Sequence, residues 1–275
     1  MTNAVVHAHI KKVETTGIID THDVLAAEEP LEIRLIHGPS HNRRQQNISV
    51  TMRTPGQDEE LAAGFLFTEG IIGQYDAIAN ITLSSTPDGS IATVALKENI
   101  LPELGNTSRN FQSTASCGVC GKTELSGIHT GVNVSSSHPV SFPASLLYQL
   151  PGILRGEQPV FDTTGGLHAA ALFDLTGKLL ILREDIGRHN AVDKLIGAAM
   201  AQQMMPLQST LLLLSGRAGF ELIQKAAMAG IPIIAAVGAP SSMAVKTAAA
   251  WNITLVGFLR EQRFNIYTAA ERITL

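Results

Sequence analysis

Hydrophobic positions in the N-terminal third of the chain follow two different periods. In two stretches, apolar and polar side chains alternate, which is the period of a strand. Two further apolar stretches flank Pro-Asp-Gly-Ser at residues 87–90, a sequence typical of the turn of a β-hairpin. Between the first two stretches and this hairpin, apolar residues recur four apart, which is the period of a helix. Acidic residues fill the first turn of this predicted helix, and Gly70 follows its last turn. The predicted strands are residues 31–35, 48–52, 81–84 and 91–96, and the predicted helix is residues 58–68. Residues 1–29 lack such a pattern and are predicted to be a frayed lead-in to a small α+β domain over residues 1–105.

After residue 160, short apolar stretches alternate with amphipathic ones. The predicted strands are residues 167–173, 179–182, 211–214, 233–237 and 253–258, and the predicted helices are residues 189–200, 219–229 and 241–251. The first two strands form a hairpin about Thr176-Gly177. A preceding helix over residues 143–154 is expected to break at Pro151, because proline in a helix interior costs about 3 kcal/mol. The alternation implies a largely parallel sheet with helices on both faces, and hence an α/β domain over residues 106–275.

Each predicted strand of this domain ends in a polar junction. The carboxyl ends of parallel strands share one edge of a sheet, where ligands bind and where helix N-termini offer free N–H groups to phosphate. The candidates at the first two junctions are Gly187, Arg188, His189, Ser215 and Arg217. They predict a site for an anionic, phosphorylated ligand, although each residue taken singly fits an ordinary helix cap or solvated side chain. His168 lies within an apolar stretch and is interpreted as a core histidine.

Composition and charge narrow the class of protein. The chain has 275 residues, of which 45% are hydrophobic and 16% charged, so it can bury a substantial core. A net charge of −4 argues against a nucleic-acid binder, which usually carries a basic surface. The N-terminus lacks the continuous apolar core of a signal peptide, and no run reaches the ~20 apolar residues of a membrane span. We therefore expect a cytoplasmic protein without a membrane segment.

Both cysteines lie two residues apart in Cys117-Gly118-Val119-Cys120. Two thiols at this spacing can coordinate a soft metal, cycle through a disulfide or carry a sulfur atom. The structural alternative is that they are small buried hydrophobes, which the surrounding glycines and polar residues disfavour. A closed zinc site needs two further ligands, and the sequence has no second CxxC motif and no pair of histidines at ligand spacing. We therefore expect no bound metal.

Five segments together resemble the FdhD family, the sulfur-carrier accessory proteins of formate dehydrogenase. They are residues 64–72, the cysteine motif at 117–121, the long segment Glu184-Asp185-Ile186-Gly187-Arg188-His189-Asn190-Ala191-Val192-Asp193-Lys194, residues 215–225 and residues 252–258. The resemblance implies a cytidine-deaminase-like α/β domain after the small α+β domain. The zinc chemistry of the deaminases should be missing, because His168 is not followed by the glutamate of an H-x-E motif.

The resemblance also implies a function. Members accept sulfur from a cysteine desulfurase as a persulfide and pass it to the molybdenum cofactor in its bis-molybdopterin guanine dinucleotide form, which is then inserted into formate dehydrogenase. Carried over to this chain, Cys117 holds the persulfide, Cys120 is a candidate resolving thiol, and the family suggests a homodimer. The segment carried over as the cofactor site is Phe258, Leu259, Arg260, Glu261, Gln262 and Arg263. Glu261 and Gln262 depart from the small residues or proline common there, and Glu261 is expected to point away from a pyrophosphate.

Two other functions are compatible with the same residues. The first is a nucleotide-binding thiol-disulfide redox protein or regulator, whose two cysteines would cycle between thiols and a disulfide. The second is a degenerate deaminase that acts as a binding module. A carrier gains a sulfur atom on a thiol when it is incubated with a cysteine desulfurase and cysteine. A redox protein gains no sulfur and only loses the two thiol hydrogens when its disulfide forms.

Overall fold

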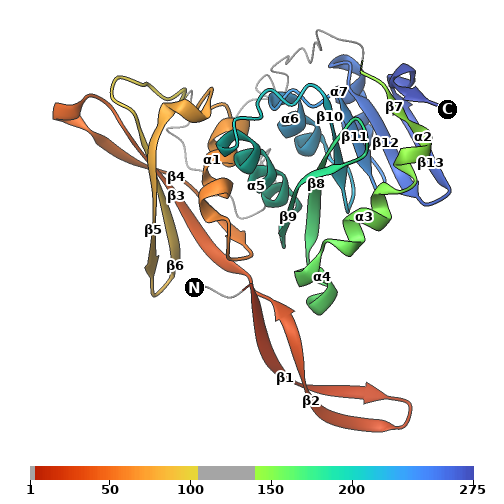
Figure 1. Ribbon diagram of the computed structural model, residues 1–275. Coiled ribbons are helices and arrows are strands. Elements are labelled where there is room, and N and C mark those ends of the chain that lie inside the picture. The colour runs from red at the N-terminus through yellow and green to blue at the C-terminus, as the bar shows by residue number, and fades with distance from the viewer. Residues whose placement is uncertain (1–3, 105–139) are drawn as a thin grey trace.

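The computed structural model describes residues 4–104 and 140–275, which form a mixed α/β structure with two principal sheets (Figure 1). The N-terminal part contains a four-stranded sheet of order β4-β3-β6-β5, with β3 parallel to β6 and the other pairs antiparallel. Its strands are β3 (Glu29–His37), β4 (Arg44–Arg53), β5 (Ile78–Thr86) and β6 (Gly89–Leu96). Helix α1 (Asp58–Thr68) packs on one face, against the fully buried Leu31, Ile33 and Leu35. The strands, the helix and the hairpin predicted here are confirmed.

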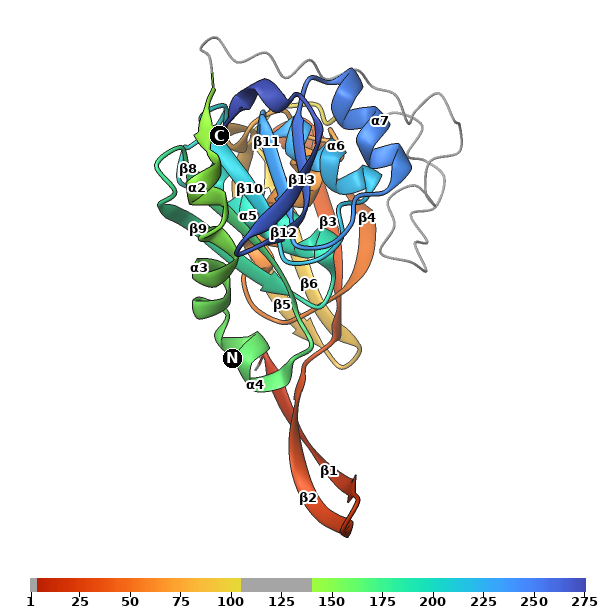
Figure 2. The same cartoon turned by 90° about the vertical axis from the view of Figure 1, so that its right-hand side faces the viewer.

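The predicted frayed lead-in is wrong, because most of it forms a long β-hairpin. Strands β1 (Val5–Glu14) and β2 (Gly17–Ala26) pair over their full length, and the hairpin extends away from the rest of the molecule in both views (Figures 1 and 2). Both of its faces are largely exposed and carry charges, such as the Lys11–Asp20 pair with an Nζ–Oδ1 distance of 2.9 Å. A strand without a buried face lacks the alternation by which strands are recognised in a sequence.

The C-terminal part contains a six-stranded sheet of order β13-β12-β11-β10-β8-β9. Its strands are β8 (His168–Asp174), β9 (Leu179–Asp185), β10 (Thr210–Leu214), β11 (Ile233–Ala236), β12 (Thr254–Arg260) and β13 (Arg263–Thr268). Only the β10–β11 and β11–β12 pairs are parallel, so the prediction of a largely parallel sheet is wrong. The β8–β9 hairpin joins β10 in the antiparallel direction, and the unpredicted β13 folds back along β12. Short strands β7 (Phe142–Pro143) and β14 (Ile273–Thr274) pair separately.

Helices cover both faces of this sheet, as predicted (Figure 2). One face carries α5 (Arg188–Ala201), α6 (Phe220–Met228) and α7 (Ser242–Ala250), and the other carries α2 (Ala144–Leu147) and α3 (Leu150–Gly156). The alternation of strand side chains decides which face each residue joins: Leu212 packs with the first group of helices, and its neighbour Leu213 packs with the second. The helix predicted over residues 143–154 is interrupted, with Pro151 in the first turn of α3, and a short α4 (Pro159–Thr164) follows.

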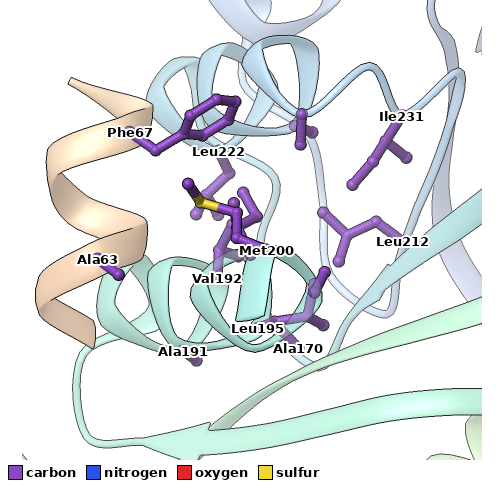
Figure 3. Packing of buried hydrophobic residues seen from close by; sticks show 14 of the residues in the cluster. Ala63, Phe67, Ala170, Ala191, Val192, Leu195, Met200, Leu212, Leu222 and Ile231 are labelled. Atoms are coloured by element: carbon purple, nitrogen blue, oxygen red, sulfur yellow. The ribbon is translucent and has the colours of Figure 1, made fainter. Parts of the chain in front are cut away.

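One hydrophobic core joins the two sheets through α1 and α5. Figure 3 shows Phe67 of α1, Val192 of α5 and Leu222 of α6 in this core, together with Leu212 of β10. The domain boundary predicted between residues 105 and 106 falls in the segment 105–139, outside the described residues, and stays a prediction.

Two glycines bring α1 and α5 into close contact. A Cβ atom on Gly64 would overlap the carbonyl oxygen of Asp193, and one on Gly197 would overlap the carbonyl oxygen of Glu60. The helices therefore cross backbone to backbone, which fixes α5 relative to the N-terminal sheet.

We expect the Gly64→Ala variant to lose about 2–3 kcal/mol of unfolding free energy, because α1 and α5 must separate to admit the methyl group. Gly73→Ala is the matched control, since a Cβ at that position meets no atom within 4 Å. Urea unfolding of both variants measures the difference. Equal stabilities of the two variants would show that the helix contact is looser than this geometry.

Candidate functional site

The polar junctions predicted at the strand ends do gather on one edge of the six-stranded sheet. His168 at the start of β8 pairs with Asp185 at the end of β9, and Ser215 follows the end of β10. The Ser215 backbone N–H donates to the Ala169 carbonyl at 3.0 Å, and the Ser215 hydroxyl accepts from the Ala169 N–H at 2.8 Å. The antiparallel hairpin thus brings the start of β8 and the end of β9 to the edge at which the parallel strands end. Ser215 itself serves to join β8 to β10.

The loops that follow β10 and β11 are joined by backbone hydrogen bonds. The Gly238 N–H donates to the Gly216 carbonyl at 2.8 Å, and the Ser241 N–H donates to the Ala218 carbonyl at 2.9 Å. A Cβ on Gly238 would lie 2.8 Å from the Gly216 oxygen, so this crossing requires glycine at position 238. These bonds fix the backbone from which α6 and α7 begin.

Within residues 184–194, Asp185 is the buried anchor of the junction between β9 and α5. Its carboxylate accepts hydrogen bonds from the Lys194 ammonium at 2.8 Å, the Gly187 N–H at 2.8 Å and the Thr54 N–H at 3.2 Å. Lys194 also donates to the Thr54 carbonyl at 2.8 Å, and the Asn190 side chain donates to Asp185 at 3.1 Å. Asp185 and Lys194 are both fully buried. These residues hold the start of α5 against the N-terminal sheet.

Two other acidic residues of the same segment, Glu184 and Asp193, also make contacts that stabilise the fold. The Glu184 carboxylate accepts the N–H groups of Val160 at 3.3 Å and Phe161 at 3.0 Å, at the start of α4. Asp193 pairs with Lys225 of α6 at 2.9 Å. Burial acts to lower the pKa of Lys225, but its pairing with Asp193 and Glu69 outweighs burial and raises the pKa, so this lysine stays charged.

Arg188 and His189 differ from their neighbours because each keeps a buried nitrogen without a hydrogen-bond partner in the described part of the chain. These atoms are Nε of Arg188 and Nδ1 of His189. The other ring nitrogen of His189, Nε2, lies 2.8 Å from Oε2 of Glu221 in the first turn of α6. His189 is 6% exposed. Of the candidate site residues in this segment, these two have hydrogen-bonding capacity left for a ligand.

His168 lies at the sheet edge and is half-buried, so its interpretation as a core histidine is wrong. Its imidazole packs against Gly216, where a Cβ would meet Nδ1 at 3.2 Å. Burial lowers the pKa of His168, and the positive charges of Arg188, His189 and Arg217 lower it further against the opposing effect of Asp185. The sequence also gave no reason to select Glu221, whose place in the site depends on its contact with His189.

The predicted cofactor segment 258–263 forms the hairpin between β12 and β13. Phe258 has a φ of 53° and is 42% exposed, and its N–H donates to the Gly238 carbonyl at 3.0 Å. The Arg260 guanidinium donates to the Val237 carbonyl at 2.6 Å, whereas Leu259 is buried. Glu261 and Gln262 form the exposed turn, with Arg263 paired opposite Arg260.

The candidate residues therefore fall into two groups on one edge. Strands β10 and β11 lie between β8, which carries His168, and β12, which carries Phe258. Three strand spacings amount to about 14 Å. The structure brings Arg188, His189 and His168 together, places the exposed Arg217 beside them, and leaves the Phe258–Arg263 segment as a second group.

Cys117 and Cys120 lie outside the described residues, so their placement relative to these groups stays a prediction. Among the residues that are described, no cluster of three or more histidine, cysteine, aspartate or glutamate side chains is arranged to hold a metal ion.

The helices of residues 4–104 and 140–275 are all too short or too polar to span a membrane.

The fold and the sheet edge define an α/β protein with cationic and aromatic groups at one edge of its larger sheet. The chain belongs to the FdhD/NarQ family, whose model matches residues 26–274. The resemblance to FdhD is thereby confirmed.

Curated relatives agree along nearly the whole chain. A protein of Mycolicibacterium paratuberculosis named sulfur carrier protein FdhD is 50% identical to this chain, and the match covers 91% of this chain and 92% of the relative. A protein of the same name in Streptomyces avermitilis is 49% identical, and the match covers 94% of this chain and 92% of the relative. A relative of the same name in Thermoplasma volcanium is 39% identical, and the match covers 98% of this chain and 96% of the relative. A crystal structure described as a formate dehydrogenase accessory protein from Desulfotalea psychrophila superposes with a TM-score of 0.73. It covers 99% of this chain and 100% of that one, and at 23% identity it supports the fold alone.

Proposed function

We propose that this protein is a sulfur carrier for the molybdenum cofactor of formate dehydrogenase. It accepts sulfur from a cysteine desulfurase as a persulfide on Cys117 and transfers that sulfur to bis-molybdopterin guanine dinucleotide before the cofactor enters the enzyme. The observation that carries the proposal is the family match over residues 26–274, which includes both cysteines. Relatives about half identical to this chain are named sulfur carrier proteins, and two thiols two residues apart suit a persulfide and its resolution.

The sheet edge supports the part of the proposal that concerns the cofactor. A guanine dinucleotide presents a pyrophosphate and a flat base, and these groups favour positive charge, free N–H groups and aromatic surface. The edge offers Arg188, Arg217 and the starts of α5 and α6, whose N-cap residues are glycines, in one group, and the exposed ring of Phe258 with Arg260 in the other. The two groups are far enough apart to contact different parts of one extended substrate.

Further elements of the proposal concern fold, assembly and place of action. We propose that residues 106–275 form a cytidine-deaminase-like domain without the deaminase reaction, and that two copies of the chain act as a homodimer in the cytoplasm. The direct partners are then the cysteine desulfurase that supplies sulfur and the formate dehydrogenase that receives the cofactor.

Activation of formate dehydrogenase in cells tests this proposal. A strain without its own FdhD-family gene would carry the cysteine desulfurase and formate dehydrogenase of the same organism as this chain, with or without the chain itself. We expect formate oxidation only when the chain is present. Equal formate dehydrogenase activity with and without the chain, at equal amounts of the enzyme, would refute the accessory role.

A further inference from the structure

The β1–β2 hairpin, residues 5–26, is an arm that extends away from the rest of the molecule (Figures 1 and 2). The body meets the arm at its base, where Ala26 lies beside Gly166: a Cβ on Gly166 would be 3.5 Å from the Cβ of Ala26. None of the arm residues is buried, so the described part of the chain covers neither of its faces. A two-stranded hairpin without a covering layer is marginally stable in water, because it has no second surface against which to bury its side chains.

The arm exposes large hydrophobic side chains both near its base and near its tip. Val6 and Leu25 near the base are 46% and 43% exposed, and Val13, Ile18 and Ile19 near the tip are 73%, 67% and 48% exposed. Single hydrophobic residues scattered over a surface are normal, but contiguous exposed ones mark a surface that another molecule covers. The arm therefore has the character of a contact surface.

The strand register assigns the side chains of the arm to its two faces. Directly opposed residues point to the same face, and successive residues along a strand alternate between faces. One face, here called the apolar face, holds the pairs Val6–Leu25, Ala8–Asp23, Ile10–Thr21 and Lys12–Ile19. The central pairs of the opposite face are His7–Val24, His9–His22 and Lys11–Asp20. Every pair on the apolar face contributes an aliphatic side chain, whereas the centre of the opposite face is mostly ionisable.

The charged residues of the apolar face favour a second copy of the arm that runs in the opposite direction. Lys12 lies near the tip and pairs with Glu14 at 2.9 Å, whereas Asp23 lies nearer the base. Antiparallel arms bring Lys12 of each copy towards the partner's Asp23, while parallel arms would bring like charges together. An ammonium has three hydrogens to donate, so Lys12 can keep Glu14 and also reach a second carboxylate. A two-fold axis perpendicular to the arms gives this arrangement, with the same surface used by both copies.

The size of the arm indicates how far such a contact extends. Ten residues per strand give a face about 33 Å long, and two strands make it about 10 Å wide, so two arms supply roughly 700 Å². Stable interfaces bury about 1,200–2,000 Å² in total. The body next to the arm base exposes Val50 and Met52 of β4, at 50% and 42%, and Met52 pairs with Pro30 at the start of β3. Antiparallel arms place the tip of one copy beside this part of the other, where Val13 and Ile18 can complete the interface.

We propose that the β1–β2 arm forms the interface of the homodimer, with the apolar faces of two arms packed against each other in antiparallel orientation. The tip of each arm lies beside the base of its partner. The inference rests on the homodimer of the proposed function and adds the surface that forms it.

Sedimentation velocity of the full chain over a range of concentrations tests the interface. We expect a dimer for the wild type, and for Leu25→Asp a dissociation constant raised by about a hundredfold or more, since each copy would bury an unpaired carboxylate. Val24→Asp is the matched control, because it makes the same kind of change one residue earlier, on the opposite face, and should leave the dissociation constant unchanged. Thermal unfolding of each variant checks that its body is folded.

Charge reversal tests the orientation of the arms. Lys12→Asp should weaken the dimer severalfold, because it places a carboxylate beside the partner's Asp23. Adding Asp23→Lys to the same chain should restore the wild-type affinity if the arms are antiparallel. Parallel arms would gain nothing from the second change, since like charges would still lie together.

The outcomes separate the arm from the rest of the proposed function. A wild type that stays monomeric would leave the arm to a different protein and overturn both this interface and the homodimer. Equal dissociation constants for Leu25→Asp and Val24→Asp would overturn the interface and leave the homodimer standing, and failure of the double charge reversal to restore the dimer would overturn the antiparallel orientation. Sulfur loading is read separately from the mass of the chain, so the carrier function stands or fails independently of these results.

Discussion

The Cys117→Ser variant is expected to lose all persulfide loading and all activation of formate dehydrogenase. A thiolate is the group that receives and holds the sulfur atom, and a serine hydroxyl cannot form a persulfide. Charge does not choose between the two cysteines, because Lys122 would favour the thiolate of either one. The family resemblance chooses Cys117. The measurement is the intact mass of the variant after incubation with a cysteine desulfurase and cysteine.

Cys120→Ser is the matched comparison, with the same chemical change three residues away. It should still load sulfur and be impaired in delivery, because a resolving thiol acts after the persulfide has formed. Sulfur loading retained in Cys117→Ser and lost in Cys120→Ser would show that the persulfide lies on the second cysteine.

The Asp185→Ala variant is expected to lose about 3–5 kcal/mol of unfolding free energy, the cost of leaving one partner of a buried ion pair uncompensated. The Lys194 ammonium would keep the Thr54 carbonyl, at 2.8 Å, and the more distant Glu184 carbonyl, at 3.4 Å, while the N–H groups of Thr54 and Gly187 would lose their acceptor.

The control for this loss is Asp162→Ala. Asp162 pairs with Arg155 at 3.0 Å, but both side chains are more than half exposed, and exposed pairs contribute about 0–1 kcal/mol. Urea unfolding of the two variants gives the comparison. A loss in Asp185→Ala no larger than that in Asp162→Ala would contradict the role of Asp185 as the anchor of this junction.

The elements that could be predicted from the sequence are those in which the hydrophobic pattern reports burial. Helix α1 spans the predicted residues 58–68, and the core strands β3 and β10 appear where apolar residues alternate or run together. The β1–β2 hairpin was missed because neither of its faces is buried, so its pairing leaves no period in the sequence. The direction in which β8 and β9 join β10 depends on the choice of partner strand, which hydrophobicity does not encode.

The position of the site at one edge of the sheet could also be predicted from the sequence pattern. Polar residues at strand ends mark the edge of a sheet, and Arg188 and His189 do lie there. The pattern cannot show that Asp185 accepts hydrogen bonds from Lys194, Asn190 and backbone N–H groups, whereas Nδ1 of His189 has no hydrogen-bond partner among the described residues. That difference depends on contacts made by residues far apart in the chain. Glu221 was missed for the same reason, since its role depends on α5 and α6 beginning together.

The central claim is that the chain carries sulfur as a persulfide on Cys117. The most direct test is mass spectrometry of the wild-type chain after incubation with a cysteine desulfurase and cysteine, followed by peptide mapping. The carrier function predicts that the intact mass rises by one sulfur atom, that a reductant removes it, and that the added atom maps to the peptide at Cys117. A chain that gains no sulfur and only loses two hydrogens between Cys117 and Cys120 would be a thiol-disulfide redox protein, and the claim would be wrong.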